Sequence, residues 1–223
     1  MSFAPLGVFC LIGKFVIADG LDIFQDVLAY VVLLISLLLF HAFFTYSLFL
    51  KFVGRLNPIT FFKKMKNVAI FAFSTSSSAA TIPVTLKTVN HDLGVNQNVA
   101  SFVVPVGATI NMDGTAIMQG LATVFIAQMS GIDLSLFQYI QVVLLAVATS
   151  IGTAAVPSAG TITLIIILQQ FNLPLEAIGI ILAVDRVLDM IRTSVNVTGD
   201  AAIACIVAKS ENQLDENIFN SKT

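Results

Sequence analysis

The chain has 223 residues, of which 57% are hydrophobic and 11% are charged, and its mean hydropathy is +0.94. Soluble domains carry roughly 25% charged residues, so this composition excludes an ordinary soluble protein and indicates one that lies in the lipid bilayer. The formal net charge of −2 argues against nucleic acid as a partner. Neither Cys10 nor Cys205 has a second cysteine or a histidine at ligand spacing, so we predict neither a metal cluster nor a disulfide framework.

The first apolar run, within residues 2–19, is about 16 residues long, shorter than the roughly 20 that a membrane-spanning helix needs. It follows Met1 directly, without the basic region or the cleavage site of a secretory signal peptide. We therefore expect residues 1–20 to be the later part of a membrane helix that the chain enters part-way.

A second apolar run, residues 24–52, predicts a transmembrane helix within the segment 21–56. His41 lies inside it with no acidic residue nearby in the sequence, so we interpret it as a packing or interfacial residue rather than a proton carrier. The loop that follows is basic, and the positive-inside rule places it in the cytoplasm. It carries about half of the 11 basic residues, namely Lys51, Arg55, Lys63, Lys64 and Lys66.

The next apolar segments are interrupted. A run of small hydroxyl residues, 74–78, divides the first, and a polar centre, 149–160, divides the second. Each apolar arm has about 10 to 15 residues and is too short to cross a bilayer alone. We predict two re-entrant helical hairpins, over residues 57–92 and 132–173, whose tips are buried in protein or line a wet cavity.

Each predicted hairpin is followed by a helix that carries Asn and Asp. Residues 93–131 contain NMDGT, and residues 174–209 contain NVTGD. Repeated units with broken segments at matching positions are typical of secondary transporters, so we predict an inverted-repeat transporter core. Chance similarity between two tracts of small residues is the alternative.

The last helix has the clearest pattern. Asp185, Asp189, Arg192, Asn196 and Asp200 follow one another at spacings of 4, 3, 4 and 4 residues. At about 100° per residue they fall within an arc of roughly 80°, so one face of this helix is polar and points into the protein. The tail that follows, residues 210–223, is polar, and we expect it to be disordered or loosely attached on the cytoplasmic side.

Ionised side chains at the centre of a bilayer cost a few kcal/mol each, so these groups must meet one another, water or a ligand. An internal salt-bridge network alone would satisfy them, but it leaves the broken hairpins and Asp113 unexplained. The alternative is an ion-coupled solute site, with the backbone from Gly107 to Gly114 unwound. There Arg192 would bind a carboxylate and Asp189 an ammonium group, while carbonyl and carboxylate oxygens would hold sodium. An acidic amino acid carries both of those groups.

Four motifs in order, the SSS tip, ATINMDGT, SIGTAAVPSAG and LDMIRTSVNVTGD, resemble the glutamate transporter family, the dicarboxylate/amino acid:cation symporters. The resemblance covers residues from about 3 to 210. It implies an all-α membrane protein with transmembrane helices and two re-entrant hairpins. It also implies a chain truncated at its amino end, beginning in helix 5 and without helices 1 to 4, and a homotrimer when the protein has its full length.

The resemblance also implies site residues and roles. Arg192 would bind the side-chain carboxylate of the substrate and Asp189 its amino group. The implied substrate-binding residues are Ser77, Ser78, Thr115, Val156, Gly160, Asp189, Arg192, Thr193 and Asn196. Sodium ions, co-transported and without any organic cofactor, would occupy three sites. The implied ligands are Gly107, Asn111, Asn196 and Asp200 at the first, Thr109, Ser150, Ile151 and Thr153 at the second, and Asn111 and Asp113, with the missing helix 3, at the third.

One further position narrows the type of transporter, and another has two open interpretations. Gln119 stands where the family's excitatory members carry a proton-binding glutamate, which implies a prokaryotic, sodium-coupled member in the plasma membrane. Arg186 either supplies charge near the first hairpin tip, where some members have an arginine, or pairs with Asp185; the sequence leaves both open.

We therefore expect sodium-coupled symport of aspartate or glutamate by alternating access, and no enzymatic activity. One alternative is a non-transporting fragment of such a transporter. Another is an intramembrane aspartyl hydrolase in which Asp113 and either Asp189 or Asp200 form a carboxylate dyad.

Overall fold

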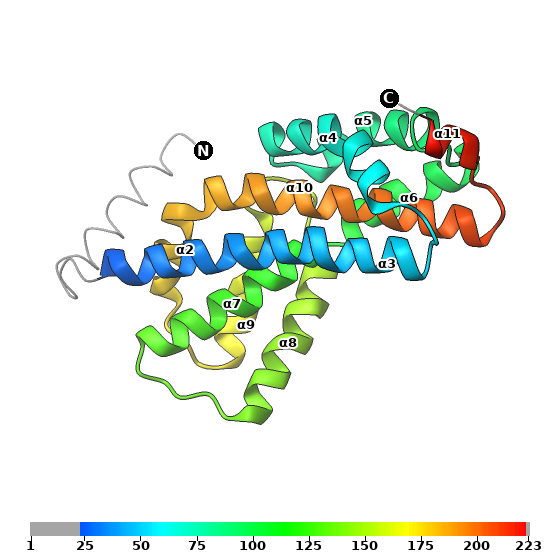
Figure 1. Cartoon of the computed structure of the whole chain (residues 1–223). Helices are drawn as coiled ribbons and strands as arrows, with labels where there is room; N and C mark the ends of the chain where they lie inside the picture. The colour runs from blue at the N-terminus through cyan, green and yellow to red at the C-terminus, as the bar shows by residue number, and fades with distance from the viewer. Residues whose placement is uncertain (1–22, 222–223) are drawn as a thin grey trace.

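A computed structural model describes residues 23–221, and within that range the regular secondary structure is helical, apart from one isolated bridge between Val95 and Leu214 (Figure 1). The predicted segment 1–20 lies outside the described residues. The helices in chain order are α2 (Ile23–Phe40), η1 (His41–Thr45), α3 (Tyr46–Phe52), α4 (Pro58–Thr75), α5 (Ser78–His91), α6 (Gln97–Ile110), α7 (Asp113–Met129), α8 (Leu136–Ile151), α9 (Ala159–Gln170), η2 (Leu175–Ala177), α10 (Ile178–Ser210) and α11 (Glu216–Asn220).

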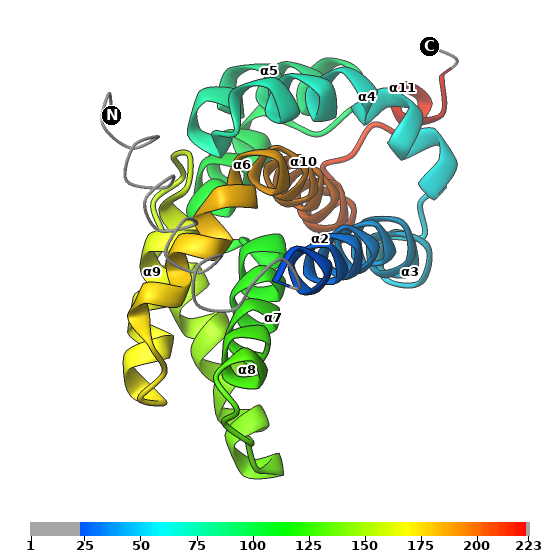
Figure 2. The ribbon, with the colours of Figure 1, turned by 90° about the vertical axis from the view of Figure 1, so that its left-hand side faces the viewer.

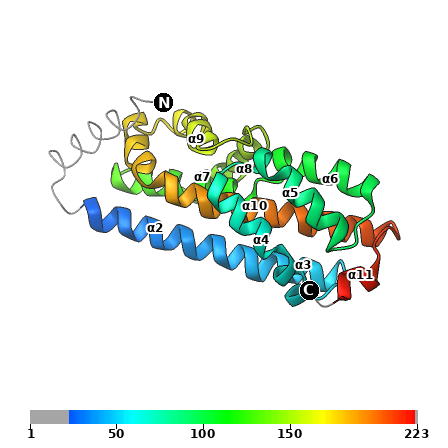
Figure 3. The same ribbon diagram turned by 90° about the horizontal axis from the view of Figure 1, so that it is seen from above.

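α10 is the central element. α2 and α3 run along one side of it, α4, α5 and α6 cover a second side, and α7, α8 and α9 extend from a third (Figure 2). α2 and α10 lie side by side over most of their length (Figure 3). Two hydrophobic clusters form the core, and residues of α10 belong to both, which ties the two halves of the molecule together.

α2, η1 and α3 join into a helical rod, residues 24–52. In the described part of the chain this is the one helix that is long and apolar enough to cross a membrane, by length and composition. Leu34 and Leu38 are fully buried on its inner face, whereas Val32 and Phe40 are more than half exposed on its outer face. The five residues of η1 form a π turn inside the rod.

α4 and α5 form a first helical hairpin, and α8 and α9 form a second. Asn57 caps α4, and the helix ends where Ser76 adopts a left-handed conformation with φ of 51°. The Ser77 side chain then accepts a hydrogen bond from the backbone N–H of Ala80 and starts α5. The second hairpin begins with a capping box between Ser135 and Gln138.

The tips of the two hairpins meet, although they lie far apart in the sequence. Ser77 Oγ donates a hydrogen bond of 2.9 Å to the carbonyl oxygen of Ala155, and the N–H of Ala79 donates to the same oxygen at 3.2 Å. Each tip therefore supplies a polar partner for backbone that would otherwise be unsatisfied inside the protein.

The predicted unwinding from Gly107 to Gly114 is wrong in extent. Only Asn111 and Met112 leave the helical conformation, between α6 and α7. Both glycines are helical, and their role is close approach. A Cβ atom on Gly107 would lie 2.7 Å from Asp200 Oδ1, and one on Gly114 would lie 2.9 Å from Asn196 Oδ1. These glycines let side chains of α10 reach the backbone of α6 and α7.

The expectation of a disordered tail is also wrong for residues 210–221. They turn back from α10, pair with the segment between α5 and α6, and form the short helix α11. Phe219 is fully buried in the core cluster that also contains Phe61 and Leu93. One large aromatic side chain therefore anchors a segment whose composition is otherwise polar.

The close packing of α10 against the rod is testable. In Gly199→Ala the new methyl group would collide with the Tyr46 hydroxyl and the Asn111 amide, so we expect a loss of stability of about 1–3 kcal/mol. In the control Gly120→Ala the methyl group meets open space, so stability should stay the same or rise by up to about 1 kcal/mol. Thermal unfolding of the purified chain in detergent, followed by circular dichroism, measures both. Equal melting temperatures for the two variants would contradict the packing.

Candidate functional site

The two hairpin tips, α7 and α10 surround a small cavity of about 20 Å³. A cavity of this size holds roughly one water molecule, so it is too small for an amino acid as it stands. Each residue predicted to bind substrate lines it except Ser77, whose hydroxyl is engaged between the tips. The lining residues are Ser76, Ser78, Met112, Thr115, Thr153, Ala154, Ala155, Val156, Gly160, Asp189, Arg192, Thr193 and Asn196.

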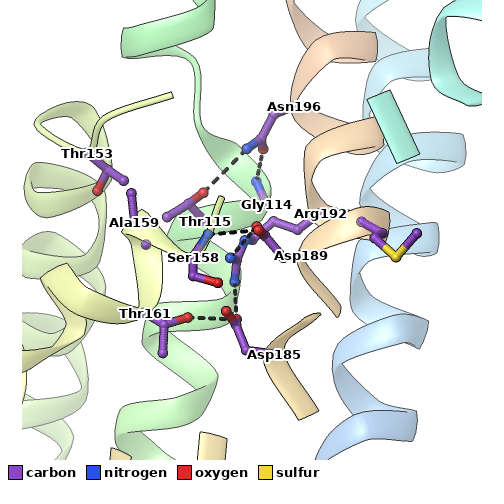
Figure 4. Close-up of polar contacts among 12 residues, drawn as sticks. Gly114, Thr115, Thr153, Ser158, Ala159, Thr161, Asp185, Asp189, Arg192 and Asn196 are labelled. Atoms are coloured by element: carbon purple, nitrogen blue, oxygen red, sulfur yellow. Dashed lines mark hydrogen bonds and ion pairs between the residues drawn. The ribbon is translucent and has the colours of Figure 1, made fainter. Parts of the chain in front are cut away.

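Arg192 lies at the centre of the site with only 2% of its surface exposed. Its guanidinium contacts Asp189 Oδ1 at 2.5 Å and Asp185 Oδ1 at 3.3 Å (Figure 4). Asp185 also accepts a hydrogen bond of 2.6 Å from Thr161 Oγ1, on the second hairpin. Buried ions are tolerated when they are paired in this way, and removing one partner is strongly destabilising. Asp185 therefore pairs with Arg192, whereas Arg186 is exposed and has no ion pair within residues 23–221.

Asp189 joins α10 to the tip of the second hairpin. Its Oδ2 accepts a hydrogen bond of 2.9 Å from the backbone N–H of Ser158, which has a left-handed conformation (Figure 4). Its two oxygens thus serve Arg192 and the hairpin tip. The carboxylate therefore contacts both α10 and the tip of the second hairpin, and a ligand that bound Asp189 would lie beside both donors.

Asn196 and Thr115 complete one wall. Asn196 Oδ1 accepts from the N–H of Gly114 at 2.8 Å, and its Nδ2 donates to Thr115 Oγ1 at 3.3 Å. Gly160 faces Thr115 so closely that a Cβ atom there would lie 2.7 Å from Thr115 Cγ2. Thr193, also buried, lies next to Arg192 in the same lining. Close packing and short polar side chains together fix the shape of the cavity.

Ser76 is a lining residue that the sequence-based prediction missed. It is 2% exposed, and its hydroxyl has no hydrogen-bond partner in the described part of the chain. Its left-handed conformation turns the chain at the tip, so the three consecutive serines take different directions. Nothing in the run SSS indicates which serine does so, and the structure assigns the bridging position to Ser77 and cavity positions to Ser76 and Ser78.

Three of the four residues predicted for the first sodium set, Gly107, Asn111 and Asp200, lie in contact. Asp200 is 2% exposed, accepts a hydrogen bond of 3.1 Å from Asn111 Nδ2, and forms no ion pair with any described residue. Its carboxylate lies against Gly107, and Asn111 and Asn196 bracket the same region of α6 and α7. Asp200 thus offers a buried carboxylate without a cationic partner among the described residues, which suits a bound cation. Asn111 presents its amide nitrogen to it, and the Asn196 oxygen is bonded to Gly114.

The second set is less compact. Ser150 and Thr153 are buried at the end of α8, and the Ser150 carbonyl already accepts N–H groups from Gly152 and Thr153. Ile151 is 46% exposed. Thr109 is exposed as well and donates its hydroxyl to Val106, and no hydrogen bond among residues 23–221 joins it to α8. The helices are neighbours, but these oxygens are not gathered around one point by hydrogen bonding.

Asp113, predicted for the third set, has partners that were not expected. Its Oδ2 lies 3.2 Å from His41 Nε2 and 3.2 Å from the Tyr46 hydroxyl. His41 therefore has an acidic partner that is distant in the sequence, and its interpretation as a packing or interfacial residue rather than a proton carrier stays a prediction. The π turn between His41 and Tyr46 pairs residues five apart, which an α-helical spacing rule does not anticipate. The signal available in the sequence was the presence of a histidine and a tyrosine in one apolar run, because both side chains need polar partners there.

The carboxylates of the predicted hydrolase dyad belong to different networks. Asp113 contacts His41 and Tyr46, whereas Asp189 contacts Arg192 and Ser158. No hydrogen bond links Asp113 to Asp189 or Asp200 in the part of the chain that the structure covers. The geometry therefore gives no support to a shared proton between two aspartates.

Paired helical hairpins whose tips meet over buried ionisable groups are typical of secondary transporters. Residues 1–210 match the sodium:dicarboxylate symporter family, and the chain belongs to that family. The family consists of integral membrane transporters, which agrees with the composition and with the sequence-based assignment.

Curated relatives are excitatory amino acid transporters. The chain is 44% identical to one from Caenorhabditis elegans, and the aligned region covers 93% of the chain and 42% of the relative. It is 44% identical to excitatory amino acid transporter 2 of Mus musculus over 100% of the chain and 41% of the relative. The chain thus spans about two fifths of these relatives. They are animal proteins, so they give no support to the expected prokaryotic membrane.

The contact between the hairpin tips leads to a prediction. Ser77→Ala removes the hydroxyl that caps α5 and bridges to Ala155, so the amides of residues 152–158 should exchange hydrogen several-fold faster. Loss of the cap itself costs about 1 kcal/mol. Ser74→Ala is the matched control, because Ser74 is exposed and bonds only within α4. Hydrogen-exchange mass spectrometry of the chain in detergent measures both, and unchanged exchange at 152–158 in Ser77→Ala would refute the bridge.

Proposed function

We propose that the chain supplies the carboxyl-terminal transport core of a sodium-coupled symporter for an acidic amino acid, aspartate or glutamate. The observation that carries the proposal is Arg192, buried between Asp185 and Asp189 beneath the meeting hairpin tips. Membership of the sodium:dicarboxylate symporter family and similarity to excitatory amino acid transporters support it.

In this proposal the substrate replaces ion pairs and hydrogen bonds within the protein by similar interactions with itself. Its side-chain carboxylate takes the guanidinium of Arg192 in bidentate geometry, and its ammonium group takes Asp189. Ser158 then loses its bond to Asp189, and the second hairpin moves aside to admit the substrate. Ser76, Ser78 and Thr115 offer hydroxyl groups to the substrate's other carboxylate. Alternating access follows when the loaded core moves against a scaffold supplied by the rest of the protein.

Sodium is the coupled ion in this proposal. Asp200, with Asn111, Asn196 and Gly107, would bind the ion next to the Gly114 and Thr115 wall, so ion binding and substrate binding stabilise the same arrangement of α7. Such coupling is worth about 1–3 kcal/mol between two ligands. The second set, at Thr109, Ser150, Ile151 and Thr153, and the third, at Asn111 and Asp113, are further proposed sites.

Gln119 supports coupling without a proton at that position. It is fully buried, its Nε2 donates to Gly160 and Thr163, and its Oε1 accepts from Thr149. All of these partners lie on the second hairpin. The amide therefore ties α7 to that hairpin through hydrogen bonds that do not depend on pH.

The whole protein's assembly is part of the same proposal. A homotrimer with a cytoplasmic carboxyl end would provide the scaffold that residues 23–221 do not contain. A chimera in which this chain replaces the matching part of Mus musculus excitatory amino acid transporter 2 tests transport directly. Sodium-dependent uptake of labelled aspartate into vesicles is the expected result. Binding without uptake would favour the alternative of a fragment that does not transport, and absence of both would refute the proposed function.

Arg192→Ala tests the substrate site. We expect loss of labelled aspartate binding by at least about 100-fold, because a buried bidentate charge pair is worth several kcal/mol. Sodium binding should remain. Because Asp185 and Asp189 would lose their partner, folding must be checked by gel filtration, with Arg186→Ala as the control for removing an exposed arginine of the same helix. Unchanged aspartate affinity in a folded Arg192→Ala protein would rule out the assigned role.

Asp200→Asn tests the ion site. The substitution keeps the shape of the side chain but removes its negative charge, so more sodium should be needed to support aspartate binding. We expect the half-saturating sodium concentration to rise about tenfold, equivalent to about 1.4 kcal/mol. The exposed Asp133→Asn, on the loop before α8, is the control. Titration of aspartate binding with sodium measures the effect, and identical curves for both variants would exclude Asp200 as a ligand.

A further inference from the structure

The segment after α10 docks on the base of the first hairpin. Asp215 N–H donates to the Gly94 carbonyl at 2.8 Å, and Asn96 N–H donates to the Gln213 carbonyl at 2.9 Å. Gly94 has a positive φ of 73°, and a Cβ atom there would lie 2.5 Å from the Asp215 carbonyl oxygen. Phe219 fills the adjoining core cluster. We call residues 211–221 the tail clamp.

Lys64 is the polar centre of this contact. Although it belongs to the basic stretch predicted to set membrane topology, it is only 6% exposed, whereas Lys63 and Lys66 on the same helix are exposed. Its Nζ donates to the carbonyl oxygens of Asp92 at 2.8 Å and Ile218 at 2.7 Å, and to Ser221 Oγ at 3.3 Å.

The partners of Lys64 explain why a lysine is buried there. Asp92 is the C-cap of α5, and Ile218 and Ser221 are at the end of α11. The last carbonyls of a helix lack intrahelical donors and carry partial negative charge, so an ammonium group is a favourable partner for both ends. One side chain on α4 thus joins the end of α5 to the end of the tail clamp.

The second hairpin has no equivalent attachment in the described structure. At its base, Leu136 and Phe137 are 79% and 68% exposed. The first hairpin is held at its base by the tail clamp, and at its tip it contacts Ala155. The two hairpins differ, therefore, in how firmly their arms are tied to α10.

We propose that Lys64 is a positioning residue, which acts with the tail clamp to hold the first hairpin in fixed register with α10 and so keeps Ser76 and Ser78 opposite Arg192. The effect of this register on transport rests on the proposed function. The contact between the tail clamp and the first hairpin is independent of that function.

The test compares Lys64→Met with Lys66→Met, which removes the same charge from an exposed position of the same helix. In Lys64→Met the amides of residues 78–95 and 211–221 should exchange hydrogen about tenfold faster or more, because hydrogen bonds to a buried charge are lost. Residues 136–170 of the second hairpin should be unaffected. Phe219→Ala, which removes the anchor of the tail clamp and leaves Lys64 unchanged, should loosen residues 78–95 in the same way.

Three outcomes would overturn the proposal. These are equal exchange in Lys64→Met and Lys66→Met, loosening of the second hairpin to the same degree as the first, and an unaffected first hairpin in Phe219→Ala. Lys64→Arg, which keeps a charged donor, should restore at least part of the protection. A general loss of folding would instead speed exchange throughout α10.

Binding of labelled aspartate then separates this proposal from the proposed function. If Lys64 positions the first tip, Lys64→Met should weaken aspartate binding at saturating sodium by about tenfold, while Lys66→Met should leave it unchanged. Absence of binding by the unaltered chain and by the chimera would count against the proposed function alone. Normal aspartate affinity in a Lys64→Met protein with a loosened hairpin would show that Lys64 does not act on the site.

Discussion

The structure depends on the need to pair a guanidinium that is buried at the centre of the molecule. Arg192 is 2% exposed, and an ion in such a place is tolerated only if carboxylates and hydrogen-bond donors surround it. Asp185 and Asp189 supply the charge, while Thr161 and the Ser158 N–H hold those carboxylates from the second hairpin. The hairpin tips must therefore reach α10, and the cavity between them is as small as about 20 Å³. In the proposed function, a zwitterionic ligand with a second carboxylate replaces some of these same interactions.

Glycines allow the helices around Arg192 to come close to one another without disrupting their helical conformation. Gly107, Gly114 and Gly160 each leave room for a side chain from another element, and only Asn111 and Met112 are non-helical between α6 and α7. The helical backbone hydrogen bonding of α6 and α7 is thus interrupted over only two residues, which limits the number of backbone polar groups without a partner. The polar residues of NMDGT reach their partners through a break two residues long and through close packing, so the site can be rigid.

Much of this arrangement follows from patterns that the sequence displays. The spacing of Asp185, Asp189 and Arg192 predicts one buried polar face, because a helix of 33 residues keeps a regular period. Other features depend on departures from regularity or on tertiary packing. The π turn that brings His41 and Tyr46 to Asp113 shifts the period by one residue, and α-helical spacing rules cannot anticipate it. The tail is ordered because Phe219 is buried and because Lys64, more than 150 positions earlier in the chain, binds it. The average composition of the tail does not reveal the effect of one buried side chain or of a distant partner.

The two hairpins resemble each other in sequence but differ in how they are attached to the rest of the molecule. The arms α4 and α5 pack on α10 and α6, and their base is tied by Lys64 and Phe219. The arms α8 and α9 contact α7, and their base presents large apolar side chains outward. Gln119, Asp185 and Asp189 hold the second hairpin chiefly near its tip, through bonds to Gly160, Thr161 and Ser158. A ligand that competes for Asp189 would therefore release the second hairpin more readily than the first, because its remaining restraints lie close to the site that the ligand occupies.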